Sequence, residues 1–205
     1  VTAGGQRLFV SSSGLAVNGI PVTGASSYNG IPFYSDAANN SMYTHDVSGT
    51  DDTAANNTAY GFTAMDAITT GDQNTAVGYG AGSYLSTGSN NVLLGYRAGL
   101  NLTTGHNNVA IGGSALLNED GDGRNVAIGT SALKDQNAGA DAYNVAVGYA
   151  AGENITAGVQ NTLIGGLAGD AMTTGENNTA LGFDALGANQ TGDRNTAIGG
   201  NALAS

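Results

Sequence analysis

From residue 57 onward, the pattern of apolar and polar residues repeats every 17 positions. Each unit begins with an asparagine, and a glycine follows four positions later and an alanine seven positions later, without exception. The asparagines are Asn57, Asn74, Asn91, Asn108, Asn125, Asn144, Asn161, Asn178 and Asn195, so that a single step is 19 residues and all others are 17. Agreement at three positions in nine copies is far beyond chance, and an internal repeat therefore organises this part of the chain.

Each unit opens with a short stretch rich in β-branched residues that glycine ends, as in residues 125–129. A weaker apolar stretch surrounds the alanine, and a Thr-Gly or Ala-Gly turn such as residues 104–105 leads to the next asparagine. The pattern predicts two short strands and two turns per unit. Seventeen residues are too few for a two-helix repeat, and no 3.6-residue period is present. The sequence therefore predicts an all-β fold, a parallel β-roll or β-solenoid of nine coils.

The two faces of the first strand differ in the size of their side chains. We number positions from the asparagine, which is position 0. Positions 1 and 3 together hold mainly Val, Ile and Leu. Position 2 is mainly Ala, and position 4 is always Gly. A narrow coil suits small side chains, so the Ala/Gly face is expected inside and the larger face outside. The reverse assignment, with Val and Ile filling a slim monomeric solenoid, stays open at this point.

An uncovered row of large apolar side chains favours self-association, because soluble monomers avoid long apolar patches and each buried β-branched side chain contributes roughly 1.5 to 3 kcal/mol. The predicted interface consists of Val92, Leu94, Val109, Ile111, Val126, Ile128, Val145, Val147, Ile164, Leu181 and Ile198. The repeated asparagine is expected to form a hydrogen-bonded ladder and to tolerate a left-handed turn. The glycine at position 4 indicates positive φ or close backbone approach.

Charge and composition exclude several classes of function. Sixteen acidic residues against five Lys and Arg give a net charge of −11, which disfavours nucleic acid as a partner. Cysteine is absent, and no apolar run is long enough for membrane insertion. The two histidines, His45 and His106, belong to no catalytic or metal motif, so neither an enzyme nor a cofactor is predicted.

Two weaker candidate sites remain. Glu119, Asp120 and Asp122 form an acidic, glycine-containing segment that could bind Ca²⁺, although its spacing fits neither an EF-hand nor a calcium nonapeptide, and no metal is assigned. An aromatic column at position 5 could bind a receptor, or could instead pack on a neighbouring coil or chain. Its members are Phe62, Tyr79, Tyr96, Tyr149 and Phe183.

The first 55 residues lack the 17-residue pattern and predict a separate β-rich module. The motif Asn-Gly-Ile-Pro occurs in it twice, at residues 18–21 and 29–32. We expect a fibre or capping module over residues 1–55, followed by the β-roll domain over residues 56–205, because an open terminal coil leaves an adhesive strand edge.

The repeats at residues 108–115 and 125–132 resemble the head repeats of YadA-like trimeric autotransporter adhesins. This resemblance implies a left-handed parallel β-roll in which three chains pack around one axis, and a head that binds host surfaces. The Asn-Thr-Ala-Val-Gly-Tyr pattern at residues 74–79 is also similar to repeats of phage tail fibres, where such rolls form shafts.

These observations lead to three expectations of function. The first is a homotrimeric phage tail fibre of the virion, in contact with other tail proteins and with a host-cell receptor that is a glycan or a surface protein. The second is a bacterial trimeric adhesin at the cell surface. The third is a monomeric ice- or carbohydrate-binding solenoid.

Overall fold

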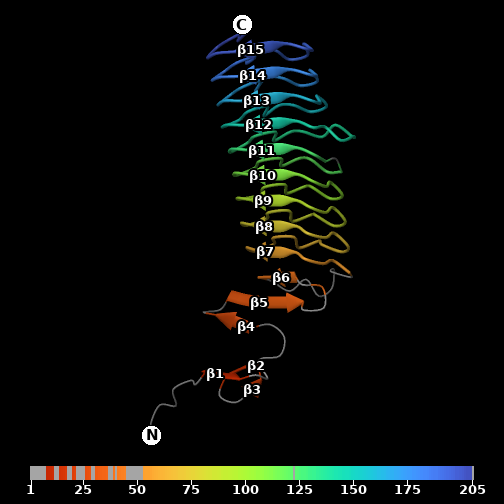
Figure 1. Ribbon diagram of the computed structural model, residues 1–205, viewed down its shortest axis with the longest axis vertical. Helices are drawn as coiled ribbons and strands as arrows, with labels where there is room; N and C mark the ends of the chain where they lie inside the picture. The colour runs from red at the N-terminus through yellow and green to blue at the C-terminus, as the bar shows by residue number, and fades with distance from the viewer. Residues whose placement is uncertain are drawn as a thin grey trace.

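The computed structural model shows a long stack of coils (Figure 1). Up to residue 36 it describes the backbone of strands alone. The described residues are 8–11, 14–17, 20–21, 26–28, 31–36, 39, 41–44, 53–121 and 123–204.

Ten parallel strands follow one another in sequence order along the stack. Each of the last nine occupies positions 1 to 3 of one repeat, and equivalent residues pair in register, as Val109 does with Val126. The strands are β6 (Ser41–Tyr43), β7 (Thr58–Tyr60), β8 (Thr75–Val77), β9 (Val92–Leu94), β10 (Val109–Ile111), β11 (Val126–Ile128), β12 (Val145–Val147), β13 (Thr162–Ile164), β14 (Thr179–Leu181) and β15 (Thr196–Ile198). The prediction of an all-β solenoid with nine coils is confirmed.

Antiparallel strands precede the solenoid. Strands β1 (Leu8–Ser11), β2 (Gly14–Val17) and β3 (Ile20–Pro21) form a small sheet of their own. Strand β4 (Ser26–Tyr28) pairs with β5 (Ile31–Asp36), and β5 pairs with β6 at the start of the parallel stack. The boundary between residues 55 and 56 stays a prediction.

Each coil contains one strand, so the prediction of a second strand around the alanine is wrong. Positions 6 and 8 have positive φ, for example 58° at Ser114 and 52° at Leu116, and left-handed residues cannot continue an extended strand. The residue before each asparagine is also left-handed, as at Arg124 with φ 65°. The asparagine itself is not, which corrects the expectation that it adopts the turn conformation.

The interior combines columns of alanine with larger apolar side chains, and the volumes of neighbouring residues are matched between coils. The alanines at positions 2 and 7, such as Ala110 and Ala115, are buried. Where position 2 is Leu93, the nearby position 8 is glycine: a Cβ added to Gly82 or Gly99 would lie 2.6 or 2.8 Å from a Leu93 methyl carbon. The Ala/Gly face therefore points inward as predicted, and the reverse assignment is excluded.

The glycine at position 4 is required for two reasons. Gly112 has φ +133°, and a Cβ there would lie 2.5 Å from the carbonyl carbon and oxygen of Gly129, the equivalent glycine of the next coil. Successive coils thus approach each other backbone to backbone at this corner. Both predicted explanations, positive φ and close approach, are confirmed.

Candidate functional site

The buried asparagines form the predicted ladder. The N–H of Asn91 donates to Oδ1 of Asn74 at 3.0 Å, and Nδ2 of Asn91 donates to the same oxygen at 3.0 Å and to the carbonyl of Gly105 at 2.9 Å. The first two bonds join consecutive coils, and the third joins the beginning of a coil to its end. This complete use of the amide assigns the column to structure.

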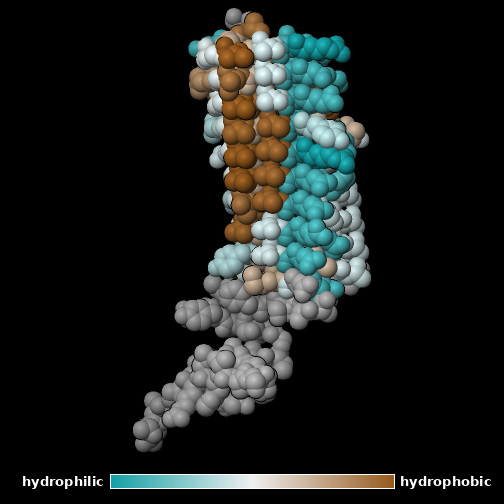
Figure 2. Space-filling model, viewed as in Figure 1, coloured by the Kyte–Doolittle hydropathy of each residue, from teal (hydrophilic) through white to brown (hydrophobic). Residues whose placement is uncertain are grey.

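The outward side chains of the strands form an apolar stripe that runs the length of the solenoid (Figure 2). We define the apolar stripe as position 3 of every coil together with the valines at position 1. All of these residues are exposed or half-buried in the single chain, and Ile198 is 68% exposed. The members are Tyr60, Val77, Val92, Leu94, Val109, Ile111, Val126, Ile128, Val145, Val147, Ile164, Leu181 and Ile198.

The structure brings together every residue of the predicted interface on this one surface. In-register pairing aligns the side chains of successive strands, so Ile111 lies beside Ile128 and Val109 beside Val126. None of the stripe residues is charged. The stripe therefore presents a continuous apolar surface on a protein with a net charge of −11.

Charge is distributed unevenly around this surface, a feature that the sequence analysis missed. The flanks of the stripe are the residue preceding each asparagine on one side and positions 5 and 6 on the other; in the described coils they carry Arg97, Arg124, Arg194 and one acid, Asp184. The other acidic residues of these coils lie outside the stripe and its flanks: Asp66, Asp72, Glu119, Asp120, Asp135, Asp141, Glu153, Asp170, Glu176 and Asp193. Comparison of repeat positions alone would have revealed this segregation.

The aromatic column at position 5 is exposed, but its members are not equivalent. Tyr79 and Tyr96 stack on each other with ring centroids 5.7 Å apart and planes inclined by 14°, and the Arg97 guanidinium lies 5.1 Å from the Tyr96 ring centroid. At least one face of each ring is therefore covered within the chain. Tyr149 and Phe62, at 64% and 75% exposed, present more of their surface to solvent.

The two described acids of the acidic segment, Glu119 and Asp120, lie in different environments. Glu119 is fully buried, and its Oε2 accepts a 3.4 Å hydrogen bond from Nδ2 of Asn125, whereas Asp120 is exposed. Asp122 lies outside the described residues. Among the residues that the structure describes, no group of three or more His, Cys, Asp or Glu side chains is placed to hold a metal ion.

His106 lies at a turn within an ion-pair cluster. Its Nε2 is 3.7 Å from Oδ1 of Asp141, whose second oxygen pairs with Arg124. Arg124 also lies over the Tyr143 ring, 5.4 Å from its centroid. These contacts close the turn of the 19-residue step; His45 lies outside the described residues.

Position 9 carries a row of charged side chains on three successive coils. Nζ of Lys134 donates to Oε1 of Glu153 at 3.1 Å, and this bond, together with the Asp135 carboxylate, raises the pKa of Lys134. Partial burial raises the pKa of the next member, Asp170, and the carboxylates of Asp184 and Glu153 raise it further. This row belongs to the acidic side of the molecule, away from the stripe.

Threonine hydroxyls at position 12 donate hydrogen bonds to backbone carbonyls of the next coil. Oγ1 of Thr103 donates to the carbonyl of Asp120 at 2.6 Å, and Oγ1 of Thr173 donates to that of Gln190 at 3.1 Å. These hydroxyls therefore connect their coils to the next.

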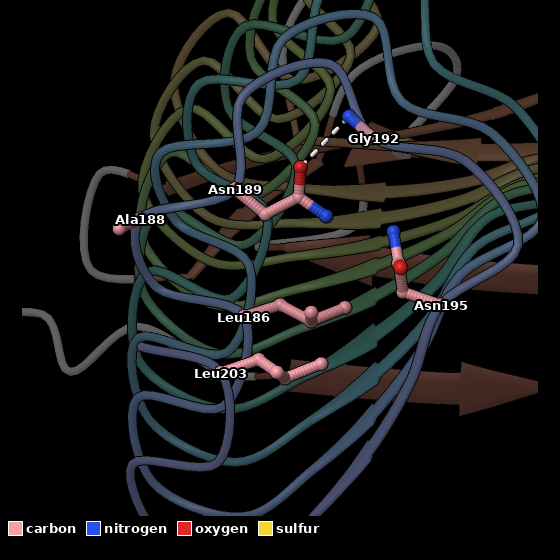
Figure 3. A pocket seen from close by; sticks show the side chains of 6 residues that line it. All are labelled: Leu186, Ala188, Asn189, Gly192, Asn195 and Leu203. Carbon is pink, nitrogen blue, oxygen red and sulfur yellow. Dashed lines mark hydrogen bonds between the residues drawn. The ribbon is translucent and has the colours of Figure 1, made fainter. Parts of the chain in front are cut away.

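A cavity of about 320 Å³ opens at the last coil (Figure 3). Leu203 is 57% exposed there, whereas Leu186, at the same position one coil earlier, is 1% exposed. The lining consists of Leu186, Ala188, Asn189, Gly192, Asn195 and Leu203. The cavity is thus the interior of the solenoid seen from its end, without titratable groups.

The chain matches no protein-family model, no curated protein and no solved structure. The described part of the chain also contains no helix with the length and apolar character needed to cross a membrane. The resemblance to adhesin and tail-fibre repeats therefore stays a prediction, and the apolar stripe is the surface on which a functional proposal rests.

Proposed function

We propose that the protein is a structural and adhesive fibre protein that assembles as a homotrimer along its apolar stripe. The observation that carries this proposal is the stripe itself, an uncharged surface that one chain leaves in contact with water. Exposed apolar surface of this extent on soluble proteins marks an interaction site. Three copies would enclose it around a common axis and give a stiff rod.

The distribution of charge favours a second copy of the same chain as the partner. Association along the stripe keeps the acidic faces pointing away from the contact, where water and salt screen them. Packing through the faces that carry positions 9 and 15 would bring acidic side chains such as Glu153 and Asp193 together. Repulsion between those faces therefore directs the chains toward the stripe.

A rod of this kind suits a phage tail fibre that projects a host-receptor-binding region, with other virion tail proteins as partners. A bacterial trimeric surface adhesin is the alternative, because the same assembly would serve it equally well. The complete open reading frame would separate them: a virion-attachment region favours the fibre, and a signal peptide with a stalk and membrane anchor favours the adhesin.

The receptor is proposed to be a glycan or a surface protein bound along the exposed aromatic column. Phe62, Tyr149 and Phe183 are the better candidates in that column, because Tyr79 and Tyr96 stack on each other. Screening the protein against a glycan array, alongside a Phe62→Ala/Tyr149→Ala/Phe183→Ala variant, tests this role. Binding by the wild type that the triple variant loses would support it, and equal binding by both would refute it.

Light scattering over a dilution series tests the assembly. The expected mass is three times the 20.2 kDa of one chain. Ile128→Asp places a charge in the stripe and should yield monomers, whereas Thr87→Asp, at an exposed turn off the stripe, should not change the mass. A wild-type mass of one chain at all concentrations would refute self-association.

A further inference from the structure

The apolar stripe changes in composition along the rod. Position 3 is apolar or aromatic throughout, but position 1 is valine only in the four coils of β9 to β12. Threonine occupies it in the coils on either side. In Figure 2 two hydrophobic columns accordingly lie next to each other over the middle of the solenoid, and one column continues alone toward its ends. The threonines are Thr58, Thr75, Thr162, Thr179 and Thr196.

Valine and threonine have nearly the same shape, so the two kinds of coil differ mainly in a hydroxyl group. A hydroxyl buried without a hydrogen-bond partner destabilises a contact, whereas a methyl group in its place stabilises it. A second copy can therefore cover the valine rows without water. The threonine rows are better suited to a wet margin.

Building on the proposed self-association, we infer that the four valines of β9 to β12 form the clasp that binds a second copy of this chain. The position 3 residues beside them, Leu94, Ile111, Ile128 and Val147, complete this surface. The threonine rows limit the clasp at both ends and hold the copies level, since a slip by one coil places a valine against a threonine at each end of the block.

The clasp also has a polarity. Two coils with threonine at position 1 precede the valine block and three follow it. When copies lie parallel and level, every position 3 residue faces its equivalent. When they lie antiparallel with the valine blocks matched, β8 faces β13, β7 faces β14, and β15 faces β6, which lies outside the apolar stripe. The parallel arrangement therefore covers the whole stripe, including Ile198.

Exchange of valine and threonine tests the clasp. Val109→Thr/Val126→Thr should raise the dissociation constant about tenfold or more, because two hydroxyls enter the dry centre. Thr162→Ser/Thr179→Ser is the matched control and should leave it unchanged. Sedimentation velocity over a dilution series measures both, and circular dichroism checks that the coils are intact.

Cysteine cross-linking tests the level, parallel arrangement, since the chain has no cysteine of its own. Val77→Cys on β8 and Ile164→Cys on β13 are five strands, roughly 24 Å, apart along the stack. With a short bismaleimide, each variant should cross-link to itself when the copies are parallel. Antiparallel copies would cross-link only in a mixture of the two variants.

Each result has a separate meaning. A monomeric wild type refutes the proposed function and the clasp together. A multimeric wild type with an unchanged dissociation constant for Val109→Thr/Val126→Thr refutes the clasp alone. Products confined to the mixture of cysteine variants overturn the parallel arrangement, and self-linked products from both single variants support it.

Discussion

Asn91 is bonded to Asn74 by both its main-chain N–H and its side-chain Nδ2, each 3.0 Å from the same Oδ1 atom. Oδ1 of Asn91 in turn accepts the N–H of Asn108 at 2.9 Å. One buried side chain therefore connects three consecutive coils. A ladder of this kind ties the start of every strand to its neighbours without help from the apolar core.

Asn91→Ala should destabilise the solenoid by about 2 to 4 kcal/mol, because it leaves the buried N–H of Asn108 and the carbonyl of Gly105 without these partners. Denaturant unfolding measures the loss. Thr87→Ala, at an exposed turn, is the control and should change the free energy of unfolding by less than about 0.5 kcal/mol. Equal effects of the two substitutions would contradict a structural role for the ladder.

Gly112→Ala and Gly113→Ala should differ sharply although the residues are adjacent. Gly112 has a φ of +133°, and a Cβ there would collide with the backbone of Gly129. A Cβ at Gly113 would meet nothing closer than 4.0 Å. We expect Gly112→Ala to destabilise by about 4 kcal/mol or more, or to prevent folding, and Gly113→Ala to have little effect. Thermal unfolding followed by circular dichroism separates these outcomes; similar melting temperatures would refute the close-approach argument.

Glu119→Gln should stabilise the protein at neutral pH by about 1 kcal/mol, because a buried carboxylate is more costly to desolvate than an amide. The next coil already has Gln136 at this position, fully buried, with its Oε1 accepting a 2.7 Å hydrogen bond from Asn144. The reciprocal Gln136→Glu should destabilise. Urea unfolding of both variants measures these effects. A lower free energy of unfolding for Glu119→Gln, or a higher one for Gln136→Glu, would disprove this account.

Asp170 should make stability depend on pH. Burial raises its pKa above the ordinary 3.8, so the folded state holds this proton more tightly than the unfolded state does. The contribution of Asp170 to stability therefore falls as pH rises through the window between the unfolded and the folded pKa. At neutral pH the charged group destabilises the fold.

Asp170→Asn removes that charge and should raise the free energy of unfolding at pH 7 by less than about 1 kcal/mol. The advantage should disappear below the ordinary carboxyl pKa, where Asp170 is protonated in both states. Unfolding curves of both proteins between pH 3 and pH 7 test this. A difference that grows on acidification would contradict the assigned direction.

Much of the structure of each coil was predictable from the spacing of its residues, because positions that hold the same residue type in every repeat are those that the structure constrains. The inward alanines, the asparagine ladder and the glycine corner were predicted correctly. The second strand was not, because Ser114 and Leu116 adopt positive φ that their own propensities oppose and that only the packed coil enforces. The large side chain of Leu93 is compensated by the missing side chain of Gly82. This pairing could have been predicted by comparing position 2 with position 8 across repeats.

Most of the apolar stripe was predicted, because period-two alternation fixes the face of each side chain once the interior is known. Tyr60 and Val77, at position 3 of the first two coils, were not included in the prediction. The flanking arginines were missed, since their significance appears only when residues from separate coils are viewed as columns. The valine block was missed for the same reason: Val and Thr are equally typical of strands, and only burial by another chain distinguishes them.

Backbone contact between equivalent glycines of adjacent coils keeps the spacing between coils constant along the solenoid. Because every column is built from residues one unit apart, removing or adding a whole 17-residue unit would shorten or lengthen the rod by one strand spacing while leaving each remaining junction as it was. The 19-residue step between Asn125 and Asn144, whose strands still pair in register, shows that extra residues can be accommodated at a turn. Length can therefore vary independently of cross-section.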